Sequence, residues 1–148
     1  IVTWLENIHI GMKGGEIYSL IENVLPKAQY GWHLNPGHLS ADEEWMSSPI
    51  FKHSTQILKS GMILQIDIIP SVKGYTGTSA EESIALADRE LQAEIQRAWP
   101  ELWARIETRK RYIVDVLNIK LSDDVIPLSS TVAYLRPFLL AKDKAFTC

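Results

Sequence analysis

An apolar run, MILQIDII, occupies residues 62–69 and constrains the fold more than any other part of the sequence. Its length and its β-branched residues are typical of a buried strand. The segment PSVKGYTGTS over 70–79 is rich in turn residues, and AEESIALA over 80–87 predicts a second strand. We therefore expect residues 62–87 to form an antiparallel hairpin or ribbon.

Helical periodicity flanks this hairpin. Apolar residues recur at helical spacing over 1–8 and again over 17–25, which predicts two short amphipathic helices. Beyond the hairpin an apolar face continues over 88–117. Pro100 interrupts this face, so we expect either a kinked helix or two helices, with Pro100 near the start of the second.

The remaining segments show no sustained period. Residues 26–61 are dominated by Pro, Gly, Asn, Ser and His, which predicts mostly loop with room for a short strand. Residues 122–140 contain two prolines and are expected to pack as an extended arm.

Composition excludes several classes of function. A length of 148 residues fits one domain, and a net charge of −3 argues against a nucleic-acid partner. No run approaches the roughly 18 apolar residues that span a bilayer, so no membrane partner is expected. Because Cys148 is the only cysteine, a disulfide scaffold is excluded, and we expect a cytoplasmic protein.

Asp67 lies within the apolar strand, where an unpaired carboxylate is costly to bury. Strict alternation places it on one face with Ile63, Gln65 and Ile69. A hydrogen-bonded carboxylate, or a strand with one solvated face, would explain it without any function.

Glu81 and Glu82 are consecutive, so they point to opposite faces of the second strand. We expect one of them to face inward with Asp67 and the other to be solvated. Two carboxylates brought together by a hairpin need a cation between them, because like charges raise each other's pKa. Oxygen ligands combined with imidazole suit Mn, Fe, Co or Zn.

The segment GWHLNPGHLSADEEW supplies a candidate imidazole. His38 follows Gly37, which allows a sharp turn and a close approach to another segment. A neutral imidazole is the usual nitrogen ligand of a metal site, although a lone histidine after a turn is more often a hydrogen-bonded loop residue. His9 and His53 have no such context and are expected to be structural.

The order of these motifs resembles that of the pita-bread metallopeptidases. Gly-His at 37–38 is followed by Gly-Met, an apolar strand and Asp over 61–67, and then by the Glu pair at 81–82. The separations of 29 and 14 positions are similar to those of the prolidase branch. The group includes aminopeptidase P, prolidase, methionine aminopeptidase and the metal-free creatinase. The resemblance covers residues 11–87.

This resemblance implies an α+β fold: half or more of a pita-bread fold, with a curved antiparallel sheet whose outer face is covered by helices 16–25 and 88–117. It implies that His38 is a metal ligand, that Asp67 is both a metal ligand and the catalytic group that handles the proton of the attacking water, and that Glu81 bridges two metal ions. In the complete protein, those ions would be Mn, Co, Fe or Zn.

The sequence also departs from the family pattern. The family takes two further aspartate ligands from upstream of the histidine, whereas residues 1–37 contain no aspartate. A His-Glu pair of the family is replaced by Trp45 and Met46, and its strand glutamate by the shorter Asp67. His33, five positions before His38, matches the family's upstream histidine only with an imperfect offset, and we assign it no catalytic role.

We therefore expect residues 1–148 to be a single domain and the C-terminal fragment of a longer catalytic domain, with a family-like core over 1–87 and a helical extension and tail over 88–148. The expected function is the C-terminal portion of a two-metal aminopeptidase or Xaa-Pro dipeptidase-like hydrolase that acts on short peptides and is inactive as this fragment.

Two alternatives use the same fold. The first is a metal-free, creatinase-like catalytic or binding module, an analogy made at the level of the fold alone. The second is an assembly module, such as a homodimer, in which helix 88–117 and the tail form a subunit contact. Exposed Trp99, Trp103 and Tyr112 would favour the second.

Overall fold

The computed structural model describes residues 1–40, 48–75 and 80–129 of the chain. The expectations for Trp45, Met46 and the tail beyond residue 129 lie outside these residues. The elements run in the order α1 (Val2–Asn7), α2 (Gly14–Val24), α3 (Lys27–Tyr30), β1 (His38–Leu39), β2 (Ile63–Ile68), β3 (Ala80–Leu86), α4 (Arg89–Ala98), α5 (Pro100–Arg111), the π-helical turn η1 (Tyr112–Val116) and β4 (Val125–Pro127).

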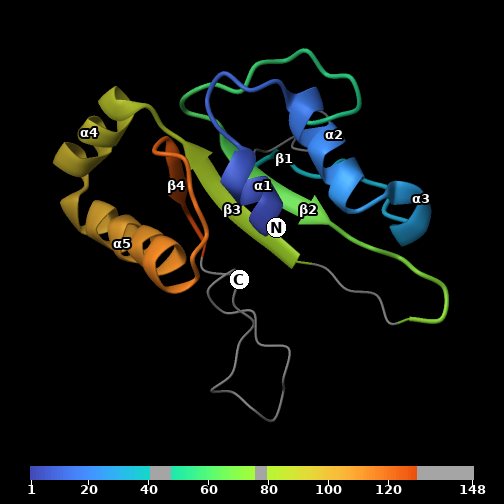
Figure 1. Cartoon of the computed structure of the whole chain (residues 1–148). Coiled ribbons are helices and arrows are strands. Elements are labelled where there is room, and N and C mark those ends of the chain that lie inside the picture. The colour runs from blue at the N-terminus through green and yellow to red at the C-terminus, as the bar shows by residue number, and fades with distance from the viewer. Residues whose placement is uncertain (41–47, 76–79, 130–148) are drawn as a thin grey trace, which may run out of the picture.

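One antiparallel sheet organises the molecule, with the strand order β1-β2-β3-β4 (Figure 1). The predicted hairpin is confirmed as β2 and β3, and its register sets Asp67 opposite Glu81. The short strand allowed for in the loop region is β1. The segment expected to form an extended arm contributes β4, which pairs with β3 at the sheet edge.

The two faces of the sheet differ in chemistry. Directly paired residues of an antiparallel sheet lie on the same face. The register therefore gathers one set of polar residues, which we call the site face: His38, Gln65, Asp67, Glu81 and Ser83. The opposite face, which we call the core face, carries Leu64, Ile66, Ile84 and Leu86, all fully buried.

Helices α1 and α2 supply the other half of the main core, as the two predicted amphipathic helices should. Trp4, Leu5 and Ile17 pack in one buried cluster with the apolar residues of the core face. Helix α2 begins on glycine because a Cβ at Gly14 would lie 1.9 Å from the carbonyl oxygen of Pro49. This close approach places Pro49 and Ile50 against the start of α2.

Pro100 separates two helices, as one of the two sequence alternatives predicts. It occupies the first turn of α5, where a missing backbone N–H removes no helical hydrogen bond. Ile106 of α5 packs in a second, smaller core with Ala85 and Ile126. The register places Ala85 on the site face, because its partner is Ile63, which alternates with Gln65.

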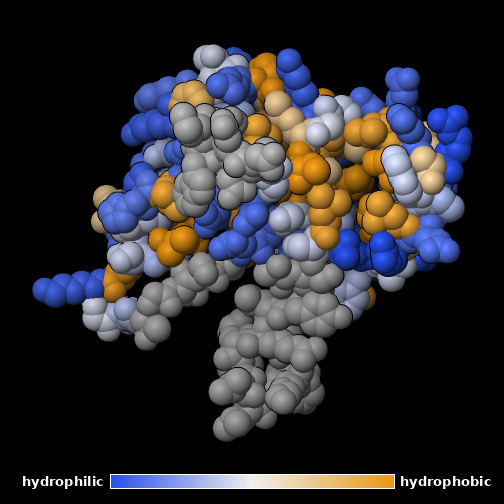
Figure 2. Space-filling view, turned by 180° about the vertical axis from the view of Figure 1, so that it is seen from behind, coloured by the Kyte–Doolittle hydropathy of each residue, from blue (hydrophilic) through white to orange (hydrophobic). Residues whose placement is uncertain are grey.

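Part of the surface formed by α4, α5 and η1 is apolar and exposed. Trp99 and Tyr112 are 57% and 43% exposed, whereas Trp103 packs against the second core. Leu102 belongs to the predicted apolar face, yet 39% of its surface is exposed. Figure 2, from behind, shows apolar side chains on the side of the molecule that carries α4 and α5. Among the described residues, no helix is long and apolar enough to cross a membrane.

Candidate metal centre

Gly37 and the β1–β2 pairing determine the position of His38. Gly37 has a φ of +134°, and a Cβ at this position would lie 3.0 Å from the carbonyl oxygen of Gln65. Only glycine therefore combines this backbone conformation with so close an approach to β2. The register then places His38 directly opposite Gln65 and next to Asp67 on the site face.

His38 and Asp67 come together as the sequence predicts. The Nε2 atom of His38 lies 3.7 Å from Oδ2 of Asp67, and both residues are buried. The other ring nitrogen, Nδ1, lies 2.9 Å from the carbonyl oxygen of Leu39. A donated Nδ1–H at this carbonyl would leave the Nε2 lone pair directed at the carboxylate, which is the tautomer suited to metal ligation.

The Asp67 carboxylate is short of hydrogen bonds. Its Oδ1 atom is buried and has no hydrogen-bond partner among the described residues. The 3.7 Å separation at Oδ2 is also longer than a hydrogen bond. A buried carboxylate in this condition is costly unless a cation or a donor reaches it.

Glu81 lies on the same face, but its carboxylate points elsewhere. It is exposed, and its Oε2 atom accepts a hydrogen bond of 2.5 Å from Nε2 of Gln65. Within residues 1–40, 48–75 and 80–129, no three His, Cys, Asp or Glu side chains are grouped closely enough to hold a metal ion. The structure thus brings His38 and Asp67 together and leaves Glu81 one strand away, engaged with Gln65.

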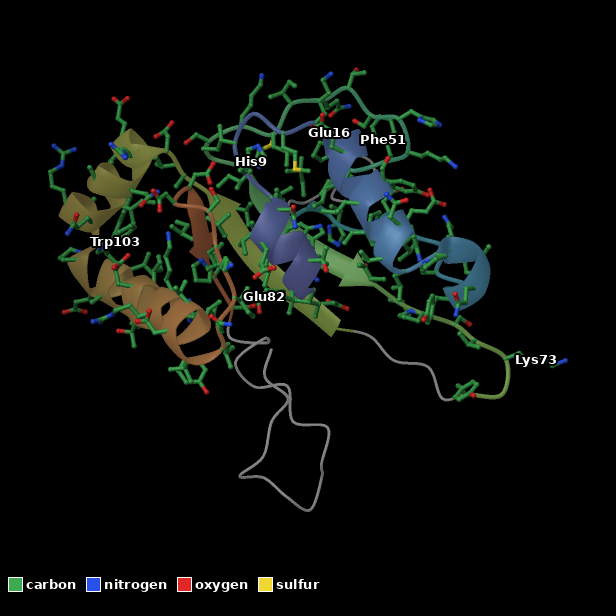
Figure 3. The ribbon with its side chains drawn as sticks, viewed as in Figure 1. His9, Glu16, Phe51, Lys73, Glu82 and Trp103 are labelled. Atoms are coloured by element: carbon green, nitrogen blue, oxygen red, sulfur yellow. The ribbon has the colours of Figure 1, made fainter. Side chains whose placement is uncertain are left out.

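Glu82 is the acidic residue that sequence reasoning misjudged. We expected the second glutamate of the pair to be solvated, but Glu82 is only 1% exposed. It lies on β3 (Figure 3), opposite Ile66 on the core face, and its Oε1 accepts a hydrogen bond from the Ser129 hydroxyl. The sequence held a signal for this burial, since strict alternation groups Glu82 with Ile84 and Leu86.

A pocket of about 220 Å³ opens beside the His38–Asp67 pair. Its described lining is His33, Leu34, Asn35, Gly37, His38, Ser48 and Asp67. His33, to which the sequence gave no role, therefore borders the same pocket. His9 lies elsewhere, with its Nδ1 2.8 Å from the carbonyl oxygen of Asn7 (Figure 3).

No protein-family model matches the chain, and no curated protein matches it significantly. Among solved structures, it is similar to a dipeptidase from Pyrococcus horikoshii OT3, with 25% identity and a TM-score of 0.45 over 60% of this chain and 28% of that chain. It is also similar to prolidase from Pyrococcus furiosus, with 18% identity and a TM-score of 0.47 over 58% of this chain and 26% of that one.

A third similar structure is a prolidase from Thermococcus sibiricus, with 23% identity and a TM-score of 0.47 over 60% of this chain and 28% of that chain. The chain resembles Xaa-Pro peptidases. The chain spans about a quarter of the length of each of these proteins.

The residues present fit part of a divalent metal site. Imidazole nitrogen and carboxylate oxygen are suitable donors for Mn, Fe, Co or Zn. The pair of His38 and Asp67, with the unpartnered Oδ1 atom of the latter, has the chemistry of two such donors. Glu81 offers a second carboxylate, and so a third donor group, from the neighbouring strand of the same face.

Proposed function

We propose that this chain contributes His38, Asp67 and Glu81 to the dinuclear metal centre of an aminopeptidase or Xaa-Pro dipeptidase-like hydrolase acting on short peptides. One observation carries the proposal: a buried imidazole and a buried carboxylate lie 3.7 Å apart, and the carboxylate has an oxygen without a hydrogen-bond partner among the described residues. The order and spacing of the three residues along the chain support it.

The proposed roles combine the positions of the side chains with the roles that the family resemblance implies. His38 would hold a metal through Nε2, while the Leu39 carbonyl fixes its ring through Nδ1. Asp67 would hold a metal and accept a proton from the attacking water, and Glu81 would add a further carboxylate ligand from β3. The bound ions, Mn, Co, Fe or Zn, would supply Lewis acidity toward the scissile carbonyl and make water easier to deprotonate.

A complete centre needs donors that this chain does not supply upstream of His38. The family pattern places two aspartates there, and residues 1–37 contain none. We therefore propose that residues 1–148 are the C-terminal part of a larger catalytic domain and do not hydrolyse peptides by themselves.

The test is made on the protein that includes the coding sequence immediately before Ile1. After loading with Mn²⁺ or Co²⁺ it should hold two ions per chain and hydrolyse a dipeptide with proline in second position. The Asp67→Asn variant should lose both ions or the hydrolysis, while residues 1–148 alone should be inactive. A folded longer protein that retains no metal would contradict the proposal.

A metal-free module on the same fold is the second candidate. One observation favours it: an oxygen of Glu81 is already occupied by the amide of Gln65. A creatinase-like activity would survive exhaustive treatment of the longer protein with a chelator, and a metal-dependent hydrolase would lose its activity under the same treatment.

A further inference from the structure

Gln65 occupies the centre of the site face. Its backbone is paired with His38 in β1 on one side and with Ser83 in β3 on the other. Its side chain reaches diagonally to β3, where Nε2 donates to Oε2 of Glu81 at 2.5 Å. A neutral amide therefore lies among the three proposed ligands and binds one of them.

The direction of the Glu81 side chain is informative. Its direct cross-strand partner is Asp67, but its carboxylate contacts Gln65, which lies two residues before Asp67 on β2 and on the same face. Like charges placed directly opposite each other destabilise a sheet, and Asp67 is a buried carboxylate. Without a cation between them, the two acids are better separated, and the Gln65 amide stabilises the separated arrangement.

We propose that Gln65 is a latch that competes with a divalent metal ion for Glu81 and so sets the metal affinity of this site. The inference rests on the proposed function and adds a positioning residue to it. In the metal-free chain, Glu81 is held by Gln65. For Glu81 to join His38 and Asp67 as a ligand, its carboxylate must leave the amide. The apparent metal affinity is therefore the intrinsic affinity multiplied by the fraction of chains in which the Gln65–Glu81 hydrogen bond is open.

The opposite role for Gln65 is chemically reasonable and gives the opposite result. Carboxylate ligands of metals are often oriented by hydrogen bonds from neighbouring residues. If Gln65 oriented Glu81 toward the metal, removing the amide would weaken binding. The latch is favoured because Glu81 is exposed and lies outside any group of three metal-binding side chains among the described residues.

The experiment measures Mn²⁺ and Co²⁺ dissociation constants of the full chain by titration calorimetry. Gln65→Ala removes the amide, and Gln65→Met removes it while preserving much of the side-chain volume. Gln56→Ala is the matched control, since Gln56 is an exposed glutamine outside the pocket. Each substitution is repeated in a Glu81→Ala background, and circular dichroism confirms that every variant is folded.

We expect both Gln65 variants to bind metal roughly 3- to 10-fold more tightly than the wild type, as the loss of one competing hydrogen bond implies. The gain should disappear in the Glu81→Ala background, and the control should bind like the wild type. In metal-free samples, the Gln65 side-chain amide resonance should shift when Glu81 is replaced.

Two failures are distinguishable. Equal or weaker binding by the Gln65 variants, with the wild type binding metal, overturns the latch and leaves the metal centre standing. No binding by any folded variant overturns the latch and counts against the metal centre itself. An amide resonance that does not respond to Glu81→Ala overturns the latch independently of metal.

Discussion

Replacing Gly37 with alanine tests how the fold positions the candidate ligand His38. Gly37 immediately precedes that residue and has a φ of +134°, a conformation that L residues rarely adopt. The added Cβ would lie 3.0 Å from the Gln65 carbonyl oxygen, 3.2 Å from Cδ1 of Ile50 and 3.3 Å from Nε1 of Trp4. The substitution therefore adds both backbone strain and crowding.

Each contribution has a known scale. A non-glycine residue in such a backbone region costs about 1–3 kcal/mol, and overpacking in a closely packed site costs a further ~1–3 kcal/mol. Gly61→Ala is the matched control, because Gly61 also has a positive φ, +87°, but a Cβ there would meet nothing within 4 Å. Gly37→Ala should therefore lower the free energy of unfolding by about 2–6 kcal/mol, and Gly61→Ala by about 1–3 kcal/mol.

Urea unfolding followed by tryptophan fluorescence measures both variants, and metal titration follows for those that stay folded. Relief of the Gly37→Ala crowding should move β1 away from β2, so this variant should also bind metal more weakly than Gly61→Ala. Equal destabilisation by the two substitutions, with unchanged metal binding, would refute the argument that the close approach at Gly37 positions His38.

Two further predictions concern acidic residues outside the site. The Asp88 carboxylate accepts hydrogen bonds from the backbone N–H of Leu91 and, to a lesser effect, from the side chain of Ser60, and both lower its pKa from 3.8. The ionised carboxylate therefore stabilises the fold at neutral pH, and this stabilisation is lost as the pH falls through the lowered pKa. The neutral cap in Asp88→Asn should therefore reduce stability at neutral pH, and this reduction should shrink as the pH falls below 3.8. An effect in urea unfolding that stays equal over this pH range would count against this reasoning. Ser129→Ala removes a hydrogen-bond donor from buried Glu82 and should lower the free energy of unfolding by ~1–2 kcal/mol. The same substitution should cost less in a Glu82→Gln background, and an equal cost in both backgrounds would argue against the contact.

The parts of the fold that could be predicted from sequence rest on strong local signals. The β-branched run over 62–69 and the turn-rich segment after it left little alternative to a hairpin. Pro100 marked a helix boundary because its ring and missing N–H are compatible with only the first turn of a helix. His38 and Asp67 were found because residues of their types are anomalous where they occur: an imidazole after a glycine turn, and a carboxylate in an apolar strand.

What sequence reasoning missed depends on pairings between distant residues. The three residues of β4 form a strand only because the edge of β3 offers them hydrogen-bonding partners. Burial of Glu82 involves Ser129, far along the chain. Gln65 gave no signal as a neutral amide, and its contact with Glu81 emerges only once the β2–β3 register is known.

Cobalt binding by residues 1–148 tests the central claim most directly, because Co²⁺ reports imidazole and carboxylate ligation through its visible absorption. We predict that the wild-type chain binds one Co²⁺ and that both His38→Ala and Asp67→Asn abolish the absorption band. His53→Asn should leave the band intact, since His53 is exposed and outside the pocket. A band that survives both ligand substitutions, or a folded wild-type chain that gives none, would contradict the claim that these two side chains hold a metal.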